Sequence, residues 1–466
     1  MTRELVLAAG CASLIAMTVV DTGGQSQQGQ TQQGQAQGQT TQGQGRGRGQ
    51  AQPSPEELMV RELVSQLTLD RYKGTIKGLT QFGDRREGTQ RNRDAVSWIE
   101  SQLKSYGCQT ARMEYDPQNP QGLTDEQRAA RGGGGRQGQA GQQGRAGGQG
   151  GQAQAGRGGQ EPQQGRGGQG RAAAPPATVL EEPRRNQAGG STYYGIVRRA
   201  TVNRSADAQP NEKLRELNSG PVIPGPVPQV YCTKVGATRP NEMYILGAHM
   251  DGIGLGEAAN DDGSGTALVM ELARIFNSPG VVTDVSIRFA LWNGEEGGLR
   301  GATAYVAQRQ KLQGQPGEPK WLGMIQHDMM MWDHGMPRAD GTLSPEQRPE
   351  ADFNIEWQSD SKMAEESAKL ALFVKLSADK YTTDYPGVLG PHMTNTDSRP
   401  FQDIVPAISL RENERGMHTG AGWNPHWHQP TDLYSTFSDK DFKLGLNAAQ
   451  ATLSAIAQLT GAKTKK

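Results

Sequence analysis

Three short apolar runs in the second half of the chain each lead directly into a residue that can bind a metal ion. MYILGAH ends at His249, DVSIRFALW is followed closely by Glu296, and LGMIQHD ends at Asp328. A fourth run, VPAISL, follows, and runs of this length are typical of strands buried in a mainly parallel sheet. Helical patterns separate the runs, over residues 263–276, 300–312 and 361–381. The alternation predicts an α/β fold in which the ligands meet at the carboxyl ends of the strands.

Five residues suited to metal binding occur in one order along this part of the chain: His249, Asp261, Glu296, Asp328 and His428. Imidazole nitrogen and carboxylate oxygen suit zinc, and a two-metal site needs one carboxylate that can touch both ions. Glu295, directly before Glu296, is not needed as a ligand. It is therefore the candidate general base, which must lie beside the attacking water. Asp251 can accept the other ring N–H of His249 and fix its tautomer. The pattern predicts a two-zinc hydrolase.

Each of these motifs is weak evidence alone, and their joint order carries the prediction. Acidic residues near turns, such as Asp262 and Asp333, are more often helix caps or solvated charges than ligands. The other histidines are expected to be surface or hydrogen-bonded core residues: His327, His334, His418 and His426. Among them His426 is the first alternative ligand, because it neighbours His428.

Beyond these residue types, whole segments resemble a known family. GAHMDG, ANDDGSGT, NGEEGGLRGA, QHDMM and NPHWHQPTD are similar to the ordered motifs of zinc metallopeptidase family twenty-eight of clan MH. Upstream, LTQFGDRREGTQRNRDAVSWIESQLKSYG resembles the helix, Arg-x-x-Gly-Thr turn and second helix that precede the catalytic core in that family. The resemblance covers residues 55–115 and 191–461. It implies a three-layer α/β/α fold with a mostly parallel mixed central sheet, as in zinc aminopeptidases.

The resemblance also implies roles and cofactors. Asp261 would bridge two Zn²⁺ ions per chain, with His249 and Asp328 on one ion, Glu296 and His428 on the other, and Glu295 as general base. Peptides would be the substrates, and aminopeptidase activity is the first expectation. A carboxypeptidase or dipeptidase shares the same ligands and stays open. A non-catalytic relative or a one-zinc glutaminyl cyclase fits less well, because all five ligands and Glu295 are present.

Two departures from the family pattern concern the substrate side of the site. Many members carry a Ser-Asp-His triplet where this chain has Thr396-Asp397-Ser398. Several carry a tyrosine upstream of it, where this chain has Met393 with His392 beside it. We expect Asp397 to support a ligand or face the substrate, and His392 is a candidate substitute for the tyrosine.

Composition limits how much of the chain can fold. Residues 24–52 and 131–171 are mainly Gly, Gln, Ala, Thr and Arg, and such segments bury too little apolar surface to offset the entropy of ordering. We divide the chain into an export signal (1–22), a disordered Gln/Gly-rich linker (23–54), an N-terminal part of the peptidase domain (55–116), a low-complexity insertion (117–190) and a catalytic part (191–466). The insertion has no strand pattern for a protease-associated domain. It also lacks interleaved aromatic residues, so we favour a linker over a polyanion-binding arm and expect no nucleic-acid partner.

The N-terminal sequence indicates where in the cell the protein is located. Residues 5–20 form an apolar run after Arg3 that resembles an export signal and is too short for a transmembrane helix. This predicts a periplasmic or extracellular protein. AAGC at Cys11 suggests a lipoprotein acceptor, so any membrane anchoring is expected only through the N-terminus. Cys108 and Cys232 either pair in an exported protein or are two buried free thiols, and the sequence leaves both open.

Overall fold

A computed structural model describes residues 52–124, 127, 202–335, 344–390, 395–413 and 424–465. The chain divides into the units Met1–Gln52 and Pro53–Lys466, and every described helix and strand belongs to the second. The predicted export signal, Cys11, nearly all of the predicted linker and most of the predicted insertion therefore lie outside the described residues. No helix in the described ranges is long and apolar enough to cross a membrane.

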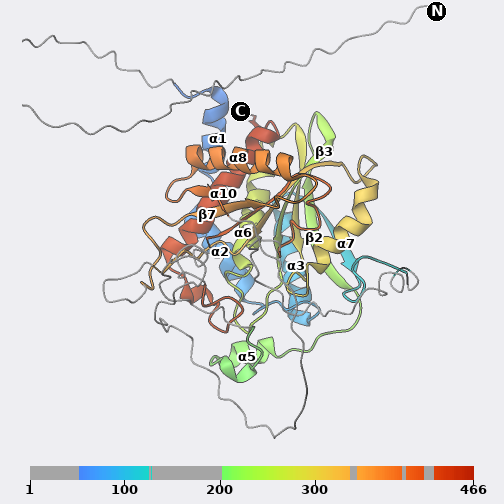
Figure 1. Cartoon of the computed structure of the whole chain (residues 1–466), viewed down its shortest axis with the longest axis vertical. Helices are drawn as coiled ribbons and strands as arrows, with labels where there is room; N and C mark the ends of the chain where they lie inside the picture. Colours follow the sequence, from blue (N-terminus) through green and yellow to red (C-terminus); the bar gives the residue numbers. More distant parts are fainter. Residues whose placement is uncertain are drawn as a thin grey trace, which may run out of the picture. The chain divides into compact units, whose positions relative to one another are not determined.

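An eight-stranded mixed sheet forms the centre of the folded unit (Figure 1). Its strands, in spatial order, are β1 (Gln109–Tyr115), β2 (Val227–Lys234), β5 (Val285–Trp292), β3 (Arg239–His249), β6 (Lys320–Asp328), β9 (Ala407–Glu412), β7 (Phe353–Trp357) and β8 (Gly387–Leu389). The central strands β5, β3, β6 and β9 pair in parallel, whereas the β1–β2, β2–β5 and β7–β9 pairs are antiparallel. Every residue of β5 is buried, as expected for a strand covered on both faces.

Helices cover both faces of the sheet, which confirms the predicted α/β class. One face packs on α1 (Pro55–Val64), α2 (Leu69–Thr80), α3 (Gln90–Ser105), α6 (Gly263–Phe276), α8 (Ala364–Tyr381) and α10 (Asp439–Leu459). The other face packs on α7 (Arg300–Arg309) and on the segment around Phe401 and Val405. The short helix α5 (Glu212–Asn218) and the strand pair β4 (Val281–Val282) and β10 (Lys463–Thr464) complete the unit.

Helix α6 runs from the site into the core. Its predicted bounds, 263–276, are those of the structure. Asp262 caps its N-terminus, because the Asp262 side chain accepts a hydrogen bond from the N–H of Gly265 at 2.8 Å. Nearly all its residues are buried. The helix therefore presents its positive end at the strand ends where the ligands were expected.

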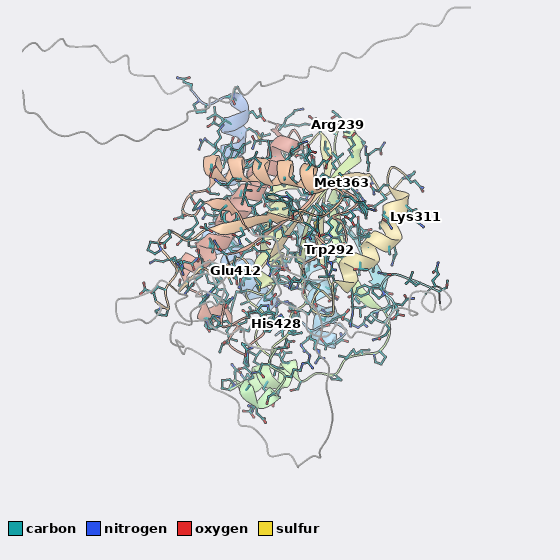
Figure 2. All side chains as sticks on the ribbon, viewed as in Figure 1. Arg239, Trp292, Lys311, Met363, Glu412 and His428 are labelled. Atoms are coloured by element: carbon teal, nitrogen blue, oxygen red, sulfur yellow. A yellow bond between two sulfur atoms is a disulfide. The ribbon has the colours of Figure 1, made fainter. Side chains whose placement is uncertain are left out.

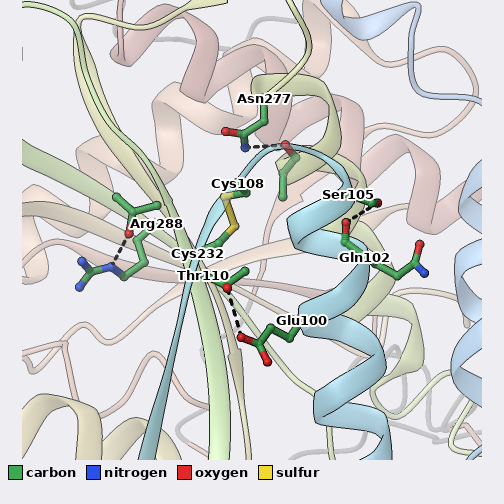
Figure 3. Close-up of a disulfide and its surroundings, with 10 residues drawn as sticks. Glu100, Gln102, Ser105, Cys108, Thr110, Cys232, Asn277 and Arg288 are labelled. Carbon is green, nitrogen blue, oxygen red and sulfur yellow. Dashed lines mark hydrogen bonds between the residues drawn. A yellow bond between two sulfur atoms is a disulfide. The ribbon is translucent and has the colours of Figure 1, made fainter.

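Cys108 and Cys232 form a disulfide, so the structure selects the first of the two alternatives for these residues. Their Cα atoms lie 5.7 Å apart, and the bond joins the residue before β1 to the middle of β2 (Figure 3). The two cysteines are separated by 124 positions in sequence. Together with the β1–β2 pairing, the bond ties residues 108–115 to residues 227–233, which follow the predicted insertion.

Candidate metal centre

The carboxyl ends of three neighbouring strands deliver the candidate ligands. His249 is the last residue of β3 and Asp328 is the last residue of β6, whereas Glu296 follows β5 by four positions. Asp261 lies just before α6. His428 comes from the loop before the short 3-10 helix Tyr434–Thr436, and it is labelled in Figure 2 with the strand-end residues Trp292 and Glu412.

The five predicted ligands form two groups that share Asp261. In the first group, His249 Nε2 lies 3.3 Å from Asp261 Oδ1 and 3.6 Å from Asp328 Oδ1. In the second, His428 Nε2 lies 3.1 Å from Asp261 Oδ2 and 2.8 Å from Glu296 Oε2. Asp261 therefore turns one carboxylate oxygen toward each group, which is the geometry that a bridging ligand needs.

The donor set fits a divalent cation in each group. Three carboxylates and two imidazoles meet with little access to water, and their side chains are at most 6% exposed. Burial, with the charge of Asp261 adding to it, raises the pKa of Glu296 to about 7, although His428 opposes the shift. Glu296 Oε1 is buried without a hydrogen-bond partner among the described residues. Such crowded, buried carboxylates are the arrangement that a bound cation balances, and oxygen and imidazole donors suit zinc.

Asp261 lies close to both histidines, and each contact shifts a pKa. Burial lowers the pKa of His428, but the Glu296 and Asp261 carboxylates outweigh it and raise the value to about 9. Burial would raise the pKa of Asp261, but hydrogen bonds with His249 and His428 lower it overall.

Glu295 lies beside the ligands without belonging to either group. Its backbone N–H donates to Asp251 Oδ1 at 3.2 Å. Burial raises the pKa of its carboxyl well above the ordinary value, and the nearby charges of Glu296 and Asp328 add to the shift while His249 opposes it. A carboxyl in this field that holds no ligand position is available for proton transfer.

Asp251 contacts His249 through a different atom from the one we expected. The Nδ1 atom of His249 lies 3.0 Å from the backbone carbonyl oxygen of Asp251, whereas the nearest Asp251 carboxylate oxygen is 3.7 Å away. A carbonyl oxygen orients the ring as well as a carboxylate does, since either accepts the Nδ1–H. The carboxylate instead accepts the N–H of Glu295, so Asp251 supports a ligand and the candidate base together.

Asp397 lies in the same buried charge cluster. It is fully buried, and burial raises its pKa well above the ordinary value, with Asp251, Asp328 and Glu296 adding to the shift and His249 opposing it. Gln326 Nε2 lies 3.5 Å from Asp397 Oδ2, and Asp397 Oδ1 has no partner in the described part of the chain. His392 and Met393 lie outside the described residues.

The residues set aside as structural have other partners. Asp262 is the cap of α6, and His327 is a fully buried core residue that contacts Gly247 O and Thr452 Oγ1. His426 Nδ1 contacts Thr431 Oγ1 at 2.9 Å, and His426 belongs to neither metal group. His334 Nε2 lies 2.7 Å from Asp441. His418 lies outside the described residues.

Two supporting residues were missed because their roles depend on distant contacts. The carboxylate of Asp432 accepts the backbone N–H groups of Asn260 at 2.9 Å and Asp261 at 3.1 Å. Arg85, fully buried, donates to the backbone carbonyls that follow His249, namely those of Met250, Glu257 and Ala258, each at 2.8 Å. Arg85 begins the Arg-x-x-Gly-Thr turn, and Asp432 is the last residue of NPHWHQPTD. Both motifs carried the family resemblance, so a place in these motifs is the sequence signal that could have identified the two residues.

Parts of the chain are similar to known peptidases. Residues 230–452 match the model of peptidase family M28, the family that the sequence motifs resemble. The aminopeptidase of Pseudomonas aeruginosa is 43% identical over 68 residues, which cover 15% of this chain and 12% of that protein. The probable lipoprotein aminopeptidase LpqL of Mycobacterium tuberculosis is 43% identical over 75 residues, covering 16% and 14%. The chain thus spans less than a fifth of the length of the curated relatives it matches.

A solved structure shares the fold. LapB from Legionella pneumophila superposes with a TM-score of 0.51 at 14% sequence identity, covering 87% of this chain and 75% of that one. This likeness supports the predicted architecture, a mixed sheet between helices.

Proposed function

We propose that the chain is an exported zinc aminopeptidase that holds two metal ions and uses Glu295 as its general base. The observation that carries the proposal is the pair of ligand groups that share Asp261. His249 and Asp328 would hold one ion, Glu296 and His428 the other, and Asp261 both. When bound, zinc polarises a peptide carbonyl and lowers the pKa of water, which supplies the electrophile and the nucleophile.

The protein's own residues would then move one proton. A Glu295 carboxylate oxygen takes it from the water as the oxygen–carbon bond forms, and returns it to the departing nitrogen as the carbon–nitrogen bond breaks. Asp251 fixes the backbone of Glu295 through the 3.2 Å hydrogen bond, so the base keeps its position during both transfers.

A carboxylate beside the ligands favours a substrate with a free α-amine. Glu295, Glu296, Asp328 and Asp397 lie within one electrostatic cluster. Asp397 in particular has an oxygen without a partner among the described residues. Asp397 Oδ1 could accept a hydrogen bond from a substrate ammonium group, whereas a substrate carboxylate has no proton to donate to it. This acceptor beside the ligands favours an aminopeptidase over a carboxypeptidase with the same ligands.

Export is supported by the disulfide. Bonds such as Cys108–Cys232 persist in oxidising compartments and are rare in the cytosol. Lipid attachment at Cys11 would anchor the enzyme to a membrane, and one relative is named a probable lipoprotein aminopeptidase. Fractionation of cells that express the full chain tests this: the protein should be periplasmic, membrane-associated or in the medium, and retention in the cytosol would contradict it.

A substrate panel tests the activity. The purified full chain should hydrolyse aminoacyl p-nitroanilides and short peptides, and N-acetylation of the same substrates should sharply reduce turnover. Zinc content measured on the same sample should be two ions per chain, and chelation should abolish hydrolysis. Equal cleavage of blocked and free peptides, or release of residues from the C-terminus, would favour the carboxypeptidase or dipeptidase alternative. Full activity in metal-free protein would refute the metal mechanism.

A further inference from the structure

One ligand in the centre contacts an arginine. Arg411 lies near the end of β9, and its Nη1 atom lies 3.1 Å from Asp328 Oδ2. The two residues are register partners in the parallel β6–β9 pair, so their side chains stand at the same level on the same face of the sheet. Both side chains are only 3% exposed. The contact is therefore fixed by the sheet and is poorly screened by water.

The contact divides the two oxygens of Asp328 between different partners. Oδ1 faces His249 Nε2 and the first metal group, while Oδ2 faces the guanidinium. Burial alone would raise the pKa of Asp328, but the charge of Arg411, followed by His249, lowers it. Arginine stays protonated under all ordinary conditions, so this positive charge is permanent.

The second group has no such partner in the described residues. The cation that contacts Glu296 there is His428, itself a candidate ligand. Glu296 Oε1 has no hydrogen-bond partner among those residues. Glu296 can thus offer both oxygens to an ion, whereas Asp328 offers one and carries a neighbouring positive charge. The two metal positions are chemically unequal.

We infer that Arg411 is a positioning residue that restricts Asp328 to one-oxygen ligation and weakens the His249–Asp328 position for a divalent cation. The inference rests on the proposed two-metal function. A fixed positive charge beside a ligand repels the incoming ion and withdraws charge from the carboxylate. The Glu296–His428 position consequently fills first, and the His249–Asp328 position holds the exchangeable ion.

Stepwise zinc binding to the full chain, measured by competition with a chelating dye, tests this inference. Wild-type protein should bind two ions with unequal affinity, and His249→Ala should lose the weaker step while His428→Ala loses the tighter one. Arg411→Gln, which keeps a polar side chain but removes the charge, should tighten the weaker step by about 10- to 100-fold through the lost charge repulsion and leave the tighter one unchanged. Arg411→Lys, which keeps the charge, should stay close to wild type.

A matched control and a second measurement separate the outcomes. Arg399→Gln removes an exposed arginine from the neighbouring segment and should change neither step. An unchanged or weakened second step in Arg411→Gln, or equal tightening of both steps, would overturn the inference. If Arg411→Gln does not fold, X-ray absorption of His428→Ala loaded with one zinc decides, because two-oxygen ligation by Asp328 contradicts the inference and one-oxygen ligation supports it. Wild-type protein that binds no zinc would instead refute the proposed function.

Discussion

His249 and Asp328 stand on the last residues of two neighbouring parallel strands, whereas Glu296 and His428 stand on loops. We call the His249–Asp328 group the strand-built half of the centre, and the ladder hydrogen bonds of β3 and β6 position it. The Glu296–His428 group is the loop-built half, and it needs separate supports. The backbone of His428 has a positive φ of 56°, and its carbonyl accepts the N–H of Asn203 at 3.0 Å. The same metal chemistry is thus reached in two ways, one local to the sheet and one dependent on distant contacts.

The shared residue should give the largest effect, because Asp261 alone belongs to both halves. Asp261→Ala should lose both zinc ions and nearly all activity. His249→Ala and His428→Ala should each lose one ion and keep much of the affinity for the other. Zinc content after gel filtration measures this. Retention of two ions by Asp261→Ala would contradict the bridging role.

Glu295→Gln should come next, since it removes a proton acceptor while leaving both halves intact. We expect the fold and the zinc content to be kept and kcat to fall by about 10²- to 10⁴-fold, the usual contribution of a general acid–base group. Glu296→Gln is the matched control, because replacing a ligand should lower the zinc affinity as well as kcat. Loss of zinc from Glu295→Gln but not from Glu296→Gln would mean that the two neighbouring roles are reversed.

A smaller effect is expected from a support of the loop-built half. The buried side chain of Gln209 donates to the backbone carbonyls of Leu255 at 2.8 Å and Pro430 at 3.1 Å, and so joins two loops that flank the centre. Gln209→Ala should lower the zinc affinity of the Glu296–His428 position by about tenfold, which is the usual cost of losing an outer contact at a metal site. The zinc affinity of the His249–Asp328 position should not change.

The same zinc titration provides the check on Gln209. Gln450→Ala is the control, since Gln450 is also buried but bonds to the backbone of Thr383, away from the ligands. If Gln209→Ala weakened both positions equally, or neither, the two halves would not differ in the way that their supports suggest.

The sequence predicted the strand-built half more completely than the loop-built half. Apolar runs ending at His249 and Asp328 identify both the strands and the ligands, because each signal lies within one short segment. The long helix α10 was not predicted, since it is rich in small residues and buried around most of its surface, which hides a helical period. Arg411 was missed because its contact depends on the register of β6 with β9, residues distant in sequence. The same limit left the cysteine pairing open.

The disulfide should have the smallest effect on either half, because it joins β1 to β2 at the edge of the sheet and contacts no ligand. Replacing both cysteines by serine should leave zinc content and kcat at 25 °C unchanged. Stability should still fall by about 2–5 kcal/mol, since the bond closes a long loop and restricts the unfolded chain. Thermal unfolding followed by circular dichroism measures the loss, and zinc analysis of the same sample measures the centre. A variant that kept its Tm but lost a zinc ion would show that the edge of the sheet supports the centre after all.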